Sequence, residues 1–85
     1  MPTIFTLSNG LRIVIFPNDH PPRHVHVIGP NGEAVFELNC PNGPVSIREY
    51  FGFRTKQLNA IATELMKVLS RLCAEWERIH ETGRL

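Results

Sequence analysis

Apolar residues change their spacing near the middle of the chain. Up to residue 53 they fall in short runs, rich in β-branched residues or alternating with polar ones, and such runs predict strands. The runs lie at residues 3–7, 11–16, 24–28 and 33–39. Asn9-Gly10 predicts a hairpin turn, because this pair tolerates the positive φ of tight hairpins. The first half therefore predicts a small antiparallel sheet of four strands, or of five if residues 45–53 are extended and not an irregular approach to a helix.

The second half holds one amphipathic pattern. Nine apolar residues recur at steps of three and four, which places them on one stripe of a helix. They are Leu58, Ile61, Ala62, Leu65, Leu69, Leu72, Cys73, Trp76 and Ile79. No Pro or Gly interrupts residues 55–82, Thr55 is an acceptable N-cap, and Gly83 provides a stop. The pattern predicts one long C-terminal helix.

The predicted elements form a single α+β domain over residues 1–85, with a β-rich part at 1–53 and the helix at 55–81. At ~1.5 Å per residue this helix would be ~39 Å long. A domain of this length has a diameter of roughly 30 Å. The helix is therefore expected to overhang the sheet. Trp76, Ile79 and His80 would then present apolar surface to a small partner protein or to a second copy in a homodimer.

The third and fourth strands can be assigned to faces. His24 and His26 alternate with valine, so both point to the same face of the sheet. If the apolar sets of the two strands pair, the histidines lie on the face that holds Glu33 and Glu37. Two registers remain, and they place either His24 or His26 opposite Glu37. In both, a carboxylate would orient an imidazole and favour its protonated form.

Three of the four histidines lie within seven residues, at His20, His24 and His26. Two ligands on a strand and a third from the preceding loop could present three nitrogen atoms to one ion. Three protein ligands and one open position are the catalytic zinc pattern. The sequence therefore predicts a candidate divalent metal site at these histidines. Asp19 or Glu37 would be a fourth ligand or would accept a hydrogen bond from one of the ligating imidazoles.

Two further interpretations use the same residues. In the first, His24 or His26 acts as a general acid or base with Glu37, while Arg23 holds phosphate, as in a small ribonuclease. In the second, the Asp-His-Pro-Pro segment fixes a loop, and the histidine face docks another protein. The charge gives little support to nucleic-acid binding, because the formal net charge is only +1.

Composition narrows the class of protein. A 42% apolar and 20% charged chain is typical of a folded domain and not of a disordered one. No apolar run is long enough to span a bilayer, and the first residues lack the pattern of a signal peptide. Cys40 lies in a predicted turn and Cys73 on the apolar helix stripe, so we expect one exposed and one buried thiol. The cytoplasm is therefore the expected compartment.

The order of several segments resembles one small bacterial family. These segments are Met1-Pro2-Thr3-Ile4-Phe5, Gly10-Leu11-Arg12-Ile13, Asn18-Asp19-His20-Pro21-Pro22, His24-Val25-His26-Val27, Gly32-Glu33-Ala34 and the late Trp76. The family is domain of unknown function 4160. The resemblance implies a soluble bacterial protein whose gene often neighbours that of another small protein, in a toxin–antitoxin-like arrangement. We therefore expect a partner-binding component of such a pair, or alternatively a histidine- or metal-dependent RNA-cleaving enzyme that uses the same face.

Overall fold

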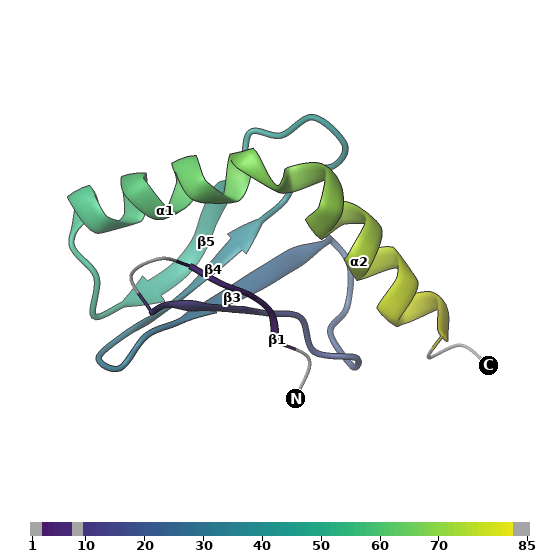
Figure 1. The fold of residues 1–85 in the computed structure, drawn as a ribbon, viewed down its shortest axis with the longest axis horizontal. Helices are drawn as coiled ribbons and strands as arrows, with labels where there is room; N and C mark the ends of the chain where they lie inside the picture. Colours follow the sequence, from purple (N-terminus) through teal and green to yellow (C-terminus); the bar gives the residue numbers. More distant parts are fainter. Residues whose placement is uncertain (1–2, 8–9, 83–85) are drawn as a thin grey trace.

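Five antiparallel strands follow one another across one sheet in the computed structural model, which describes residues 3–7 and 10–82 (Figure 1). They are β1 (Thr3–Thr6), β2 (Arg12–Val14), β3 (His24–Ile28), β4 (Glu33–Glu37) and β5 (Ser46–Phe51). The order β1-β2-β3-β4-β5 is a meander, in which short connections join neighbouring strands. The segment that the sequence leaves open, 45–53, therefore contains a fifth strand.

The first hairpin matches its predicted position. Ser8 and Asn9 of the predicted turn lie outside the described residues. On either side of them, the Leu7 N–H donates to the Leu11 carbonyl at 2.7 Å. Gly10 has a φ of 84°, a conformation that glycine adopts without a steric penalty.

The pairing of β3 with β4 fixes the two faces of the sheet. Ile28 lies opposite Glu33 and His24 opposite Glu37, which confirms the first of the two predicted registers. One face, the helix face, carries Val25 and Val27 of β3 and Ala34 and Phe36 of β4, all buried in the core cluster with residues of the helices. The other face, the histidine face, carries His24 and His26.

Two helices, α1 (Thr55–Lys67) and α2 (Leu69–Thr82), cover the helix face, so the prediction of one long helix is wrong. The break is at Val68, whose φ of −121° and ψ of 18° leave the α-helical region. Its N–H donates to the carbonyl of Leu65 at 3.1 Å, one residue short of an α-helical step. Beyond this break the chain changes direction, and α2 descends past the end of the sheet (Figure 1).

The start of α1 also differs by one residue from the prediction. Arg54, not Thr55, is the N-cap, and its backbone N–H donates to the side-chain oxygen of Gln57 at 2.7 Å. An acceptor at the third helical position is half of a capping box, which explains why the helix begins here without a Ser, Thr, Asp or Asn cap. The predicted stop, Gly83, lies outside the described residues.

The change of direction brings the end of α2 onto the core. Trp76 is only 4% exposed and joins the same apolar cluster as Leu72 and the strands. Ile79 is partly buried against that cluster, and His80 is half-buried. The predicted overhang is therefore wrong, because a straight helix would have left these residues uncovered and the bent one packs them. None of the helices within residues 3–7 and 10–82 has the length and hydropathy to cross a membrane.

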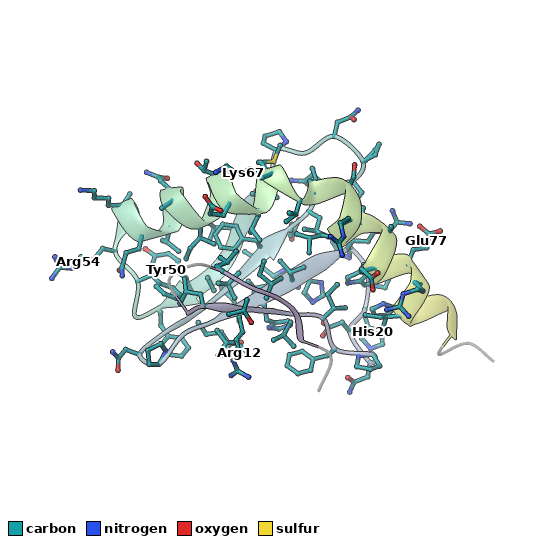
Figure 2. The ribbon with its side chains drawn as sticks, viewed as in Figure 1. Arg12, His20, Tyr50, Arg54, Lys67 and Glu77 are labelled. Carbon is teal, nitrogen blue, oxygen red and sulfur yellow. A yellow bond between two sulfur atoms is a disulfide. The ribbon has the colours of Figure 1, made fainter. Side chains whose placement is uncertain are left out.

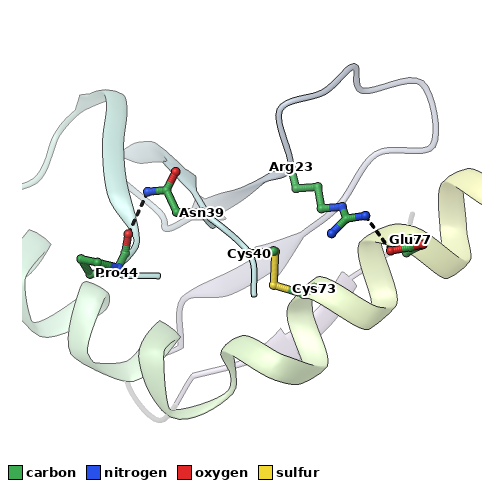
Figure 3. Close-up of a disulfide and its surroundings, with 6 residues drawn as sticks. All are labelled: Arg23, Asn39, Cys40, Pro44, Cys73 and Glu77. Carbon is green, nitrogen blue, oxygen red and sulfur yellow. Dashed lines mark hydrogen bonds and ion pairs between the residues drawn. A yellow bond between two sulfur atoms is a disulfide. The ribbon is translucent and has the colours of Figure 1, made fainter. Parts of the chain in front are cut away.

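A disulfide joins Cys40, just after β4, to Cys73 on α2, with 6.0 Å between their Cα atoms (Figure 3). The prediction of two free thiols is therefore wrong. The two residues are 33 positions apart, so their meeting depends on how α2 crosses the end of the sheet and not on any local motif. The bond ties the loop after β4 to the second helix.

Candidate metal centre

Three possible metal ligands converge on the histidine face. The ligand atoms of Asp19, His24 and His26 all lie within 4.8 Å of one another. The Oδ2 atom of Asp19 is 3.4 Å from the Nε2 atom of His24 and 3.4 Å from the Nε2 atom of His26. We call these three residues the Asp-His-His cluster, and it is the one group of this kind among the described residues.

Strand alternation and a folded loop position the cluster. His24 and His26 share a face because they are two residues apart on β3, and His26 lies between Val14 of β2 and Val35 of β4. Asp19 comes from the loop between β2 and β3. The backbone N–H of Phe16 donates to Asp19 Oδ2 at 3.2 Å, which holds the carboxylate over the histidine face.

Both imidazole rings are oriented by an oxygen at their far side. His24 Nδ1 lies 2.8 Å from the Pro22 carbonyl oxygen, and His26 Nδ1 lies 3.2 Å from Glu33 Oε2. A carbonyl or a carboxylate only accepts, so each Nδ1 carries the proton that it donates. In the neutral rings both Nε2 atoms then present lone pairs toward Asp19. A hydrogen-bonded oxygen behind a ligating histidine is the usual arrangement in metal sites.

Two of the three separations within the cluster suit a small divalent ion. Zinc binds nitrogen and oxygen at ~2.0–2.1 Å, so two ligands of a tetrahedral site are ~3.3–3.4 Å apart. The two 3.4 Å separations match this distance between two ligands of a tetrahedral site. Without a cation or added protons, three acceptor atoms would face one another, which is electrostatically unfavourable. His26 Nε2 is buried and has no hydrogen-bond partner.

The cluster is largely buried. His24 is 4% exposed, and the side chains of Asp19 and His26 are each 17% exposed. The ring of Phe16 packs edge-on against His26 with 4.9 Å between ring centroids, and the ring of Trp76 lies 6.5 Å from that of His24. Partial exclusion of water strengthens electrostatic interactions at the cluster and raises the cost of leaving it unoccupied.

One side of the cluster opens into a cavity of about 350 Å³. All three cluster residues line it, together with His20, Arg48 and Glu49. A metal held by the cluster would therefore keep a side that faces this cavity, where water or a substrate could bind.

The predicted site residues divide between those that the fold gathers and those that it separates. His24 and His26 are in the cluster; His20 lines the cavity but is not among the three converging ligands, and Asp19 takes its place. Figure 2 shows His20 at the end of the molecule near α2. The sequence treats Asp19 only as an additional ligand, because a loop pattern does not say which of two adjacent side chains turns inward.

Glu37 and Arg23, the other predicted catalytic residues, form ion pairs elsewhere. Glu37 accepts from Arg48 Nε at 3.1 Å, although its strand position is opposite His24 as predicted. Arg23 pairs with Glu77 of α2 at 2.6 Å (Figure 3). The carboxylate of β4 that contacts a histidine is Glu33, which the sequence placed on the correct face but did not pair with His26.

The fold and the cluster define the class of protein. It is a small α+β domain, with two helices on one face of a meander sheet and a two-histidine, one-carboxylate group on the other. The chain belongs to the family described as domain of unknown function (DUF4160), whose model matches residues 10–77. This range contains the whole Asp-His-His cluster and Trp76. No curated protein and no solved structure matches the chain.

Proposed function

We propose that this protein binds one divalent transition-metal ion, zinc foremost, through Asp19 Oδ2, His24 Nε2 and His26 Nε2. The observation that carries the proposal is the convergence of three acceptor atoms, one from Asp19 and two from imidazole rings that Pro22 and Glu33 orient. Two nitrogens and one carboxylate oxygen with an open fourth position are a catalytic zinc set. The same donors also suit iron(II), but the 3.4 Å edges favour a tetrahedral ion.

The chemistry that we propose is hydrolysis, with RNA as the substrate. A bound divalent ion lowers the pKa of its water to about 7 and so supplies hydroxide at neutral pH. Glu49 lines the same cavity and can accept the proton, while Arg48 offers a cation to a phosphate oxygen. The hydroxide would form a bond to phosphorus as the bond to the leaving ribose oxygen breaks, and that oxygen would take up the proton that Glu49 accepted.

Metal binding is tested by titrating zinc into the purified protein in competition with a chromophoric chelator. We expect one ion per chain for the wild type and for His20→Gln, and at least tenfold weaker binding for His24→Gln and His26→Gln. His20→Gln is the matched control, because His20 lines the cavity outside the cluster. Equal loss in all three variants, or no stoichiometric binding by the wild type, would contradict the proposal.

RNA cleavage is tested separately with a labelled single-stranded RNA. We expect cleavage by the zinc-loaded protein that a chelator stops and that His26→Gln abolishes. Zinc binding without cleavage of RNA would leave the metal centre in place and reject RNA as its substrate.

A second candidate function, binding of a partner protein in a toxin–antitoxin-like pair, is favoured by a different surface. Ile47, Tyr50 and Phe51 of β5 are 43%, 53% and 65% exposed, and β5 is an edge strand of the sheet. Large exposed apolar groups on a sheet edge are typical of interaction sites. We therefore propose β5 as the partner surface, in place of the predicted C-terminal helix.

Partner binding is tested by co-expression with the product of the neighbouring gene and gel filtration. Phe51→Ser should weaken the complex, and Met66→Ser, which changes an exposed apolar residue on α1, should not. Equal elution of the two variants would reject β5 as the surface.

We also propose the bacterial cytoplasm as the compartment; the Cys40–Cys73 disulfide counts against this proposal and therefore provides its test. Disulfides persist mainly in oxidising compartments. Thiol labelling of freshly lysed cells should therefore find Cys40 and Cys73 reduced if the protein is cytoplasmic. Complete protection of both from labelling would indicate an oxidising compartment.

A further inference from the structure

The edge strand β5 has a symmetric pattern of side chains. β5 contains a bulge at Arg48, because Glu49 pairs with Val35 and Ile47 pairs with the next residue of β4, Phe36. Ile47 and Tyr50 lie opposite helix-face residues, while Ser46, Glu49 and Phe51 lie opposite histidine-face residues. The bulged Arg48 points to the histidine face as well, where it binds Glu37 and lines the cavity.

The bulge makes this pattern symmetric about the point between residues 48 and 49. Positions 46, 48, 49 and 51 belong to the histidine face, and positions 47 and 50 to the helix face. A regular strand alternates strictly, so two copies related by a two-fold axis between residues 48 and 49 would place opposing side chains on different faces. The bulge removes that conflict for this one register.

We infer that the occupant of this edge is a second copy of the chain, paired antiparallel through β5 about a two-fold axis between Arg48 and Glu49. This inference rests on the proposal that β5 is the partner surface. In this register Arg48 lies opposite the partner's Glu49, and Glu49 opposite the partner's Arg48, so both charge pairs are complementary. Ile47 lies opposite the partner's Tyr50, an apolar pair of the kind that stabilises antiparallel sheets.

The pairing also extends the candidate metal centre. Arg48 and Glu49 line the cavity into which the Asp-His-His cluster opens. The two-fold axis passes beside them, so the partner's Arg48 and the partner's Glu49 adjoin the rim of this cavity. Each of the two cavities of the dimer is thereby lined from both copies, and a substrate at one centre would meet charges from the other chain.

A charge-swap series with sedimentation velocity tests the inference. One short strand per copy is a small interface, so we expect a wild-type dissociation constant on the order of micromolar. Arg48→Glu puts a carboxylate opposite the partner's Glu49 at both pairs and should weaken the dimer by about tenfold or more. The double variant Arg48→Glu/Glu49→Arg restores both pairs and should restore the dimer. Lys56→Glu, the same charge reversal on the exposed start of α1, is the control and should dimerise as the wild type does.

Circular dichroism of each variant shows that a loss of dimer is not a loss of fold. A wild type that stays monomeric at about 500 µM overturns the inference, as does a dimer that Arg48→Glu leaves unchanged or that the double swap fails to restore. If the wild type is monomeric alone but forms a β5-dependent complex with the neighbouring gene's product, the partner function stands and only the second copy is rejected.

Discussion

The indole ring of Trp76 lies beside the imidazole of His24, with 6.5 Å between the ring centroids. The pair links the C-terminal helix to the candidate metal centre, because His24 is a proposed ligand and Trp76 is part of the core. Trp76, which the sequence assigns to a protein interface, therefore packs beside the candidate site.

Removing the indole of Trp76 should affect stability and metal binding together. Trp76→Ala should lower the free energy of unfolding by about 3–5 kcal/mol, as buried Trp truncations do, and weaken zinc binding. Trp76→Phe keeps an aromatic ring beside His24 and should retain most of both. Urea unfolding followed by circular dichroism and zinc titration measure the two effects. An alanine variant with unchanged zinc affinity would show that the indole supports only the core.

Glu33, which contacts His26, should matter more for zinc binding than Glu37, which lies opposite His24. Glu33→Ala removes the acceptor that holds His26 Nδ1 and should weaken zinc binding by about tenfold, within the range for lost partners of metal ligands. Glu37→Ala is the matched control, since that carboxylate binds Arg48 and not a histidine. Equal zinc affinities for the two variants would argue against orientation by Glu33.

Zinc should stabilise the folded chain, because the ligands converge only when the loop and β3 are in place. At a free concentration of about 100 times its dissociation constant, zinc should raise the free energy of unfolding by about 2.7 kcal/mol. A chelator should remove this gain, and His26→Gln should not show it. Acid should weaken binding as well, because protons compete with the ion for Nε2. Thermal unfolding with and without zinc, at neutral and acidic pH, provides the measurement.

The disulfide should contribute stability by restricting the unfolded chain. With the cysteines 33 positions apart, loop-closure entropy predicts a contribution of about 3–4 kcal/mol. Cys40→Ser/Cys73→Ser should therefore unfold at a lower urea concentration than the oxidised wild type. A reductant should leave the unfolding of the double variant unchanged. In the wild type it should lower the urea concentration of unfolding toward that of the double variant. A wild type that a reductant does not affect would indicate that the bond does not form.

Some of the fold follows from local patterns. The alternation of β3 restricts its pairing with β4 to registers that keep Val25 and Val27 in the core, and the structure has one of them. The histidines therefore fall on one face as predicted. The α+β class follows from the change of spacing near residue 53.

Other features depend on tertiary structure. The break at Val68 has no Gly or Pro to mark it, and it arises where the chain must turn to cover the end of the sheet. Asp19 and His20 are adjacent in a loop, so only the folded loop shows which one turns to the histidines. Cys40 and Cys73 meet for the same reason, since α2 approaches the end of β4 only after that turn.

The Cys40–Cys73 bond gives the chain the covalent topology of a ring with two tails. The ring, residues 40–73, contains β5 and α1, while the Asp-His-His cluster belongs to the tail before it and Trp76 to the tail after it. A single protease cut within the ring leaves one molecule until the bond is reduced, whereas a cut in the first tail releases a fragment. The first tail thus supplies the whole Asp-His-His cluster and the second tail supplies the indole packed beside it, while the closed loop between them holds the proposed dimer edge.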